Sequence, residues 1–414
     1  MKRFTTLLVF LLAIGIFAPM PLGANEISVT IDGEQMDFDG MQMVIVDYRA
    51  LLPVRDIFEH LGFDVDWEHE TRTVHLSRYP EFAISITIGD YVFVNNGVEY
   101  PLDVPAQIID GRTLLPIRAV LESTGYYVVW DVDAYAVFIT SATPEYIIIF
   151  GREYSTSLTS LNLMRVSGMV LIAPEEVAQL RYMTNLTYLN LRGNNIYDIL
   201  PLAGLTNLVE LNMWGNRIGD NLEPLAGLTN LRDLDVGNNR ITDILPLANL
   251  TNLTNLSVIS NSISDIIPVA GLTNLTRLSL VSNEISDITP VAGLTNLTSL
   301  AIWSNEISDL TPLSGLTGLT FLDAGWNQIS DLSPLAGLAS LETLWLHGNH
   351  ISDLSPLEGL TNLVTLSLWN NQVSNISPLA YLDSLEWLSL EGNDIDDLSP
   401  LDGLRNLENV YIDQ

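Results

Sequence analysis

One stretch decides the fold of this chain: Leu186-Thr-Tyr-Leu189-Asn-Leu191-Arg-Gly-Asn194-Asn-Ile196. Its frame, L-x-x-L-x-L-x-x-N-x-I, returns through the C-terminal part of the chain every 22 residues, with one step of 23. The asparagines of the frame, here called the ladder asparagines, are Asn194, Asn216, Asn239, Asn261, Asn283, Asn305, Asn327, Asn349, Asn371 and Asn393. A fixed period of roughly 20–29 residues predicts a solenoid in which each coil stacks on the next.

Each position of the frame has a physical role. Leu189 and Leu191 alternate with Asn190, so both leucines point to one face of a short strand and Asn190 points to the other. We expect the leucines to form the core between stacked coils. A buried asparagine such as Asn194 needs partners for its amide donors and its carbonyl, and the turning backbone of neighbouring coils supplies them. The frame and its step are the signature of a leucine-rich repeat.

The return arm of each coil carries a second motif. It reads Pro201-Leu-Ala-Gly-Leu-Thr-Asn-Leu208 after the first frame, and proline removes a donor and restricts φ. We therefore expect a short 3₁₀ turn or an irregular segment rather than a long helix. The motif recurs from Pro224, with near copies from Pro268, Pro290, Pro312, Pro334 and Pro356. The additional residue of the 23-residue step lies in this arm, near Asn221, where it leaves the strand register untouched.

The frame, the step, the arm motif and the preceding I-S-D-[IL]-[ST] resemble the internalin class of bacterial surface leucine-rich repeat proteins, over roughly residues 157–414. The resemblance implies a right-handed β-solenoid of the α/β class with short 3₁₀ or irregular convex arms. It also implies a concave sheet that binds a protein partner, without naming that partner. The repeats themselves are expected at residues 186–414.

A second domain is predicted at residues 26–141, and its sequence is duplicated. The segment Arg49–Glu59 returns as Arg112–Glu122, at an offset of 63 residues, and a G-x-x-V-x-W stretch follows each copy. The pattern predicts a small α+β domain in which each copy has a short helix opened by proline. Both copies resemble the N-terminal domain of copper amine oxidases, which is common on exported proteins of Gram-positive bacteria.

The resemblance to this domain does not imply oxidase chemistry, which belongs to a separate catalytic domain with a three-histidine copper site. His60, His69 and His75 do not recur in the second copy, so we interpret them as surface histidines rather than ligands. Trp67 and Trp130 are interpreted as core anchors, with stacking platforms as the alternative.

Residues 1–24 have the composition of a secretory signal peptide. Lys2 and Arg3 precede the apolar run Leu7–Phe17, and small residues follow. The chain contains no cysteine, which excludes disulfides, a lipoprotein anchor and thiolate metal sites. The sequence therefore predicts an exported bacterial protein that is secreted or held at the cell wall without a covalent bond or a membrane span.

The chain is strongly acidic, with a formal net charge of -33. This charge argues against nucleic acid or anionic lipid as a partner. Its plainest interpretation is solubility outside the cell, and a basic partner or bound divalent cations are the alternatives.

Residues 142–185 are predicted to link the two domains and to cap the solenoid. A first strand is expected around Leu161 and Leu163, followed by a helix that opens at Pro174 with two acids behind it. At the other end the last frame stops after its strand, near residues 409–413. An open edge strand invites pairing with another chain, so a dimer through this strand is one prediction, and fraying is another.

The solvent-facing strand positions carry the functional prediction, because the solenoid does not constrain them. Aromatic side chains occupy many of these positions, and an exposed aromatic array is typical of a binding site. The predicted partner-binding residues are Tyr188, Trp214, Trp303, Phe321, Trp345, Trp369, Trp387 and Tyr411. Strands about 4.8 Å apart would bring the rings of the C-terminal half together, so this half is the predicted centre of the site.

Other constellations are assigned structural roles. Aspartates follow the frame isoleucine by two residues in most repeats and are expected to cap the next turn, with calcium binding as the alternative. His347 and His350 lie three apart but on different faces, which disfavours a metal site. We predict no catalytic residues, no metal site and no cofactor.

Two functions of different classes remain open. The first is a non-enzymatic, adhesin-like protein that engages an extracellular protein through the aromatic concave face. The second is a cell-wall or carbohydrate-binding scaffold in which tryptophans stack on sugar rings.

Overall fold

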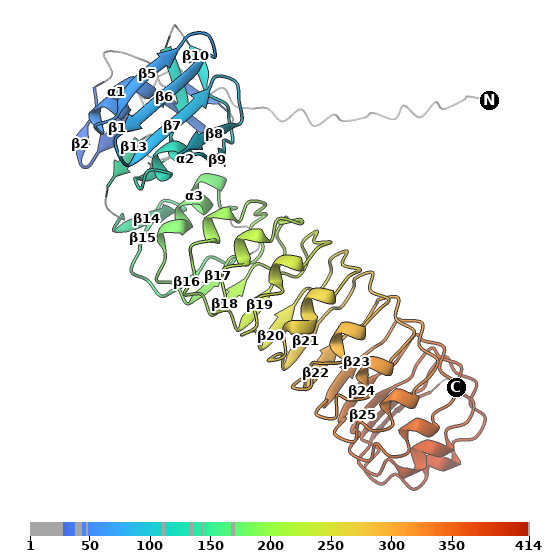
Figure 1. Ribbon diagram of the computed structural model, residues 1–414. Helices are drawn as coiled ribbons and strands as arrows, with labels where there is room; N and C mark the ends of the chain where they lie inside the picture. Colours follow the sequence, from blue (N-terminus) through green and yellow to red (C-terminus); the bar gives the residue numbers. More distant parts are fainter. Residues whose placement is uncertain are drawn as a thin grey trace, which may run out of the picture. The chain divides into compact units, whose positions relative to one another are not determined.

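The computed structural model describes residues 28–37, 44–46, 49–109, 112–131, 136–141, 144–166 and 170–412 (Figure 1). The predicted signal peptide lies outside these residues. The chain divides into two compact units, Met1–Ala142 and Thr143–Gln414. Among the helices in the described ranges, none is long and apolar enough to cross a membrane.

The first unit is rich in strands. Its elements are β1 (Ser28–Ile31), β2 (Glu34–Gln35), β3 (Val44–Val46), β4 (Arg49–Pro53), α1 (Val54–His60), β5 (Asp64–Glu68), β6 (Thr73–Arg78), β7 (Phe82–Thr87), β8 (Val92–Asn95), β9 (Val98–Pro101), β10 (Gln107–Ile109), β11 (Arg112–Pro116), α2 (Ile117–Glu122), β12 (Tyr127–Asp131) and β13 (Ala136–Thr140). They form three sheets with the strand orders β12-β13-β1-β2, β10-β11-β4-β3 and β5-β6-β7-β8-β9.

The two helices of this unit follow the same plan. Each starts directly after a proline that ends a strand, and each buries residues at positions i, i+3 and i+4 of its helix, which places them on one face. These residues are Val54, Ile57 and Phe58 in α1, and Ile117, Val120 and Leu121 in α2. Both sets belong to one apolar core. The internal duplication of the domain stays a prediction.

The prediction that Trp67 anchors this core is wrong. Its side chain is 38% exposed, because β5 is an edge strand and most of its side chains face solvent. The side chain of Trp130 lies outside the described residues. The three histidines His60, His69 and His75 are exposed, as expected.

The second unit begins with the hairpin β14 (Tyr146–Ile149) and β15 (Arg152–Ser155), then β16 (Ser160–Asn162), α3 (Pro174–Gln179) and η1 (Leu180–Tyr182). The repeat strands are β17 (Tyr188–Asn190), β18 (Glu210–Asn212), β19 (Asp233–Asp235), β20 (Asn255–Ser257), β21 (Arg277–Ser279), β22 (Ser299–Ala301), β23 (Phe321–Asp323), β24 (Thr343–Trp345), β25 (Thr365–Ser367), β26 (Trp387–Ser389) and β27 (Asn409–Tyr411). The 3₁₀ turns between them are η2 (Leu200–Leu202), η3 (Glu223–Leu225), η4 (Leu245–Leu247), η5 (Ile267–Gly271), η6 (Thr289–Val291), η7 (Thr311–Leu313), η8 (Ser333–Leu335), η9 (Ser355–Leu357), η10 (Ser377–Tyr381) and η11 (Ser399–Leu401).

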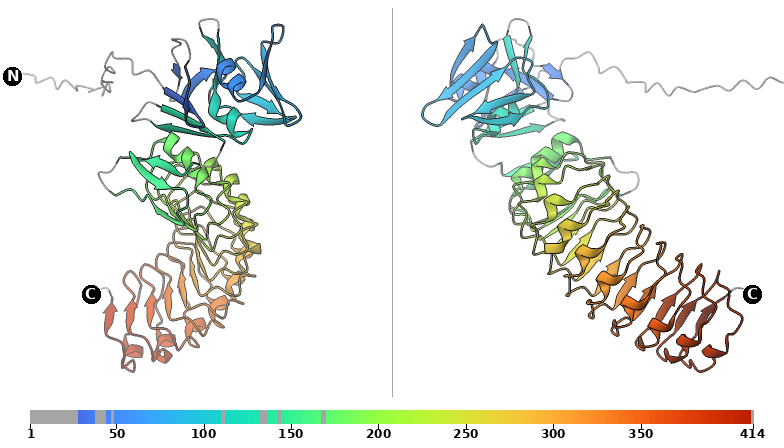
Figure 2. Two further views of the ribbon diagram at one scale, coloured as in Figure 1. Left: turned by 90° about the vertical axis from the view of Figure 1, so that its left-hand side faces the viewer. Right: turned by 45° about the vertical axis from the view of Figure 1, so that its right-hand side comes forward.

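Strands β16 to β27 form one 12-stranded parallel sheet in chain order. The frame leucines pair across each step up to β26, as Leu189 does with Leu211 and Leu211 with Leu234, and at the last step Leu388 pairs with Val410, so the inward faces stack in register. The second of these steps contains the additional residue, which the convex arm absorbs. Within this unit the sheet lies on the inner side of the curve and the 3₁₀ turns on the outer side (Figure 2). The predicted leucine-rich repeat solenoid is confirmed.

The ladder asparagines hold neighbouring coils together. The Asn327 side chain is buried, and its Nδ2 donates to the carbonyl oxygens of Ile302, Ala324 and Gly325 at 3.0, 3.2 and 3.0 Å. Its Oδ1 accepts the backbone N–H of Ile307, one coil earlier, at 3.0 Å. The predicted role is confirmed: one side chain satisfies backbone groups of two coils that water does not reach.

The aspartates of the turns act as predicted. Asp331 Oδ1 accepts the backbone N–H of Ser333 at 2.8 Å, at the start of a 3₁₀ turn, and its pKa is lowered by bonds from the Ser333 side chain and backbone. Asp220 differs, because the additional residue follows it. Its carboxylate instead accepts the backbone N–H of Thr242 in the next repeat, at 2.6 Å.

Candidate binding surface on the concave sheet

The eight predicted binding residues all lie on the solvent face of the sheet, in three groups. Tyr188 and Trp214 belong to the N-terminal repeats, Trp387 and Tyr411 to the last two, and the other four to β22–β25 and the residues just after them. All are half-buried except Tyr411, which is 45% exposed. Tyr411 lies on the edge strand β27, and its ring is 5.5 Å from that of Trp387. The dimer through this strand stays a prediction.

A row of residues crosses four successive coils at the second position after each strand. It consists of Trp303, Gly325, His347 and Trp369. Backbone hydrogen bonds join the coils along this row: Ser304 N–H donates to the Gly325 carbonyl, Trp326 N–H to the His347 carbonyl, and Gly348 N–H to the Trp369 carbonyl. The indole Nε1–H of Trp303 donates to His347 Nε2 at 3.1 Å. These two side chains are two coils apart and meet because Gly325 has none between them.

His347 fills the space above Gly325. A Cβ at residue 325 would lie 2.6 Å from the imidazole ring, closer than real Cβ contacts allow. On its other side the imidazole stacks on the ring of Trp369, with the ring centroids 5.0 Å apart and the planes within 7°. Beside this row, Phe321 meets Trp345 edge-on at 5.5 Å.

Trp326 completes the surface, and the prediction from sequence did not include it among the binding residues. The residue is 45% exposed, and its ring meets Trp369 edge-on at 5.6 Å and covers Gly348, where a Cβ would lie 2.8 Å away. Its φ is +48°, a left-handed conformation that costs a residue with a large side chain about 1–2 kcal/mol. Other repeats hold glycine, asparagine or serine at this position, so an aromatic residue there was a signal in the sequence. We call Trp303, Phe321, Trp326, Trp345, His347 and Trp369 the central aromatic cluster.

Burial perturbs one titratable group in this cluster, His347, and one on the strand beside it, Asp323. It lowers the pKa of His347, and the imidazole is neutral because Nε2 accepts a hydrogen bond. Its Nδ1 is buried with no hydrogen-bond partner within the described part of the chain. Burial also raises the pKa of Asp323 to about 6, against the opposing effect of the bond from the Gly325 backbone N–H.

Asp323→Asn should stabilise the protein at neutral pH. Because the folded-state pKa of Asp323 is above its unfolded value, its contribution to stability is fully present below about pH 4 and is lost as pH rises through about 6. Asparagine keeps the acceptor for Gly325 without the charge. The expected gain in the free energy of unfolding is about 1 kcal/mol near pH 7.5, after allowance for solvent screening, and close to zero near pH 4. Urea unfolding at both pH values measures it, and an equal gain at both would contradict the assignment.

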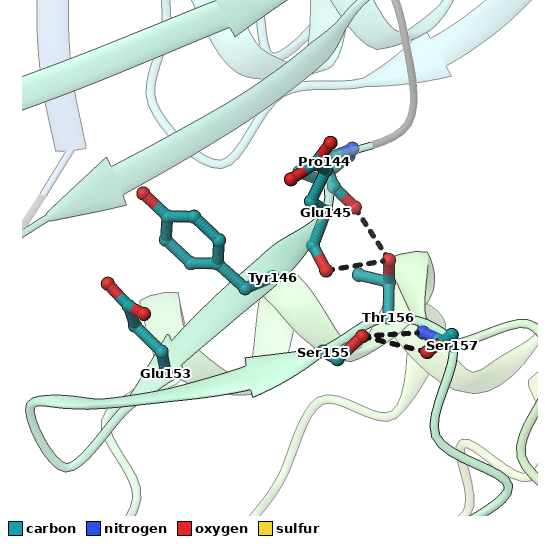
Figure 3. A pocket seen from close by; sticks show the side chains of 7 residues that line it. All are labelled: Pro144, Glu145, Tyr146, Glu153, Ser155, Thr156 and Ser157. Carbon is teal, nitrogen blue, oxygen red and sulfur yellow. Dashed lines mark hydrogen bonds between the residues drawn. The ribbon is translucent and has the colours of Figure 1, made fainter.

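A hollow with a volume of about 640 Å³ lies on the hairpin of β14 and β15 (Figure 3). Its hydroxyl groups are engaged locally: Thr156 Oγ1 donates to the carbonyl of Pro144 at 2.6 Å, and the hydroxyls of Ser155 and Ser157 share a bond of 2.8 Å. Among its lining residues there is no histidine or lysine to activate a hydroxyl as a nucleophile. We assign this hollow no chemistry.

Comparisons with known proteins agree with the architecture. The copper amine oxidase N-terminal domain family matches residues 30–139. The leucine-rich repeat family, in a two-copy profile, matches residues 184–227, 210–249, 229–272, 273–315, 295–337 and 339–381. An internalin from Listeria monocytogenes is 35% identical, and the match covers 64% of this chain and 91% of that one, with a TM-score of 0.46.

The chain is an internalin-like leucine-rich repeat protein. The repeated family matches and the 22-residue frame with its arm motif carry this assignment. A second internalin of Listeria monocytogenes is 39% identical over 46% of this chain and 83% of its own, with a TM-score of 0.44. A leucine-rich repeat protein of Leptospira interrogans shares the fold at 24% identity, covering 62% of this chain and 72% of its own, with a TM-score of 0.53.

One curated protein is similar to part of this internalin-like chain. It is named "Protease inhibitor", comes from Brevibacillus choshinensis, and is 26% identical over 102 residues, which is 24% of this chain. The match spans 29% of that protein's length. A similarity of this extent transfers no activity to the internalin-like chain.

Proposed function

We propose that this internalin-like protein is a non-enzymatic, adhesin-like binding protein, secreted or held at the bacterial cell wall. It engages an extracellular protein through the C-terminal half of its concave sheet. The observation that carries the proposal is the central aromatic cluster: five large aromatic rings and an imidazole on one solvent face. Monomeric proteins rarely expose such an array without a partner, and tryptophan is enriched among the residues that dominate interface energies.

The packing of the cluster favours a protein over a sugar chain. His347 covers one face of Trp369, which leaves a single face of that ring for a ligand. The contacts of Phe321 with Trp345, and of Trp326 with Trp369, are edge-on. The rings thus form a broad, mutually packed surface of the kind that a protein interface buries.

Export rests on the composition of residues 1–24, a charged start followed by an apolar run. It also suits the acidic composition and the absence of cysteine from the sequence. We include secretion in the proposed function for these reasons.

Trp369→Ala should weaken binding to the protein partner about 30-fold, equivalent to about 2 kcal/mol. The protein, the variant and a matched Trp214→Ala variant would be tested against a panel of purified extracellular proteins and wall polysaccharides. Trp214 was predicted from sequence to bind the partner, but its ring is covered by the guanidinium of Arg192 at 4.2 Å and it lies outside the central aromatic cluster, so it is not part of the proposed site. It stands at the same position of an earlier repeat, and circular dichroism checks the fold of each variant.

Protein binding that Trp369→Ala weakens and Trp214→Ala leaves intact would support the proposal. Polysaccharide binding with the same pattern would replace it by the wall-scaffold function. Equal binding by all three forms would exclude the central aromatic cluster as the site.

A further inference from the structure

We propose that the central aromatic cluster receives arginine or lysine side chains from an extended segment of the partner protein. The proposal rests on the proposed function and adds the chemistry of the partner. It is argued from a cation–π pair within this chain, from the distribution of charge along the repeats, and from the carboxylates beside the cluster.

The N-terminal repeats contain their own example of this recognition. The guanidinium carbon of Arg192 lies 4.2 Å from the ring centroid of Trp214, over its face. A guanidinium over an indole is a favourable cation–π pair, since the positive charge meets the negative face of the ring. This solvent face of the sheet therefore already holds one tryptophan that is occupied by a cation from the same chain.

The central aromatic cluster has no such cation from its own repeats. The sequence contains no lysine or arginine between Arg277 and Arg405, whereas acidic residues recur in every repeat of that interval. The histidine inside the cluster, His347, is neutral because its Nε2 accepts the indole proton of Trp303. These repeats therefore provide no arginine or lysine for the negative faces of the aromatic rings, which attract cations.

Carboxylates stand at both ends of the strands in the repeats of the cluster and in the next repeat. Glu391 follows Trp369 in the row of residues at the second position after each strand, since the Asn370 backbone N–H donates to the Glu391 carbonyl. At the other end, Glu342 and Glu386 directly precede β24 and β26. All three side chains are exposed, and the structure shows no ion pair or hydrogen bond to their carboxylates within the described ranges. Arginine suits this arrangement best, because a guanidinium stacks on an aromatic ring while its N–H groups bind a carboxylate.

Charge also discriminates among the possible occupants. A second copy of this chain carries the same net charge of -33 and would be repelled. A neutral sugar makes no use of the flanking carboxylates as ion-pair partners. A cationic protein segment uses both the rings and the carboxylates, so it is the occupant to which the proposal commits.

The test uses a synthetic peptide of about six Arg-Gly repeats and a matched peptide in which neutral citrulline replaces each arginine. Binding to the full chain would be followed by tryptophan fluorescence and calorimetry at about 0.15 M salt. The arginine peptide is expected to bind at least about tenfold more tightly than the citrulline peptide. Trp369→Ala should weaken the arginine peptide by about tenfold, and Glu391→Gln by about threefold, whereas Trp214→Ala should change its affinity by less than about twofold.

Three outcomes would overturn the proposal. A peptide attracted only by the overall negative charge would bind Trp369→Ala as tightly as the unmodified protein. Equal affinity for the citrulline peptide would show that the cation is not recognised. Self-association that Trp369→Ala abolishes, measured by sedimentation, would identify a second copy as the occupant.

Failure of this proposal is distinguishable from failure of the proposed function. A panel protein that needs Trp369 for binding, but has no basic segment at its interface, would leave the function standing and remove the cationic partner. Panel proteins that bind independently of Trp369 would remove the function itself.

Discussion

Asn327→Ala should lower the free energy of unfolding by about 3 kcal/mol or more. The alanine leaves the buried N–H of Ile307 without its hydrogen-bond partner. It also removes one bond from each of the carbonyls of Ile302, Ala324 and Gly325, which keep their bonds from Asn305, Asn349 and the Ser304 backbone N–H. The unpaired N–H costs about 1–3 kcal/mol, and the lost bonds to the carbonyls and a small cavity add to the loss. Urea unfolding followed by circular dichroism measures the change.

Because residue 327 lies inside the repeat array, Asn327→Ala should also make the unfolding transition less cooperative. Coils contact only their neighbours, so a weakened step in the middle of the array reduces the cooperativity between its two sides. A shallower or two-step unfolding curve is therefore expected in addition to the lower midpoint.

Asn362→Ala is the matched control. Asn362 also bonds across a coil boundary, with its Nδ2 2.9 Å from the carbonyl oxygen of Ala339, but its side chain is exposed. The equivalent residues of the two preceding repeats are Gly318 and Ser340, so the solenoid already forms without this asparagine. The expected loss is below about 1 kcal/mol. Similar losses for both variants would show that burial is not what makes the ladder asparagines important.

Gly325→Ala should weaken binding of the partner by about 100-fold. Its Cβ would lie 2.6 Å from the imidazole of His347 and force that ring to move. The move breaks the bond between Trp303 and His347 and the stack of His347 on Trp369, so one methyl group displaces most of the row. Gly325 does not have a left-handed backbone, so alanine adds little strain of its own. Binding is measured with the panel protein that the Trp369→Ala comparison identifies, and near-ultraviolet circular dichroism reports the aromatic packing.

Gly237→Ala provides the control at the same position of an earlier repeat. Its Cβ would lie 2.8 Å from Trp214 Cδ1, so it displaces a tryptophan ring as Gly325→Ala displaces an imidazole. The central aromatic cluster remains intact, and partner binding should change by less than about twofold. Loss of binding in Gly237→Ala alone would move the site to the N-terminal repeats.

The repeat architecture was predictable from the sequence because its interactions are periodic. A coil contacts its two neighbours in the same way at every step, so a residue type that recurs every 22 residues meets the same environment each time. The stacked leucines, the asparagine ladder and the aspartate turns all follow from this rule, and the one additional residue changes only the turn at Asp220. The resemblance to the internalin class rested on the same recurrence.

The central aromatic cluster was predictable only in part, because its contacts are not periodic. The sequence places Trp303, Trp345 and Trp369 on the solvent face, but does not show which rings meet. Trp303 reaches His347 across 44 residues because the repeat between them carries Gly325, and the left-handed backbone at residue 326 turns another tryptophan onto the surface. Trp67 shows the same limit in the first unit, since its exposure depends on the edge position of β5.

The sequence by itself therefore determined the solenoid, its register, its internal hydrogen bonds and the face on which aromatic residues gather. Only the tertiary structure decided which side chains form the surface, which histidine lies inside it and which glycine makes room for that histidine. The physical reason is that backbone periodicity repeats the same contacts from coil to coil, whereas side chains of unequal size fill the space that their particular neighbours leave.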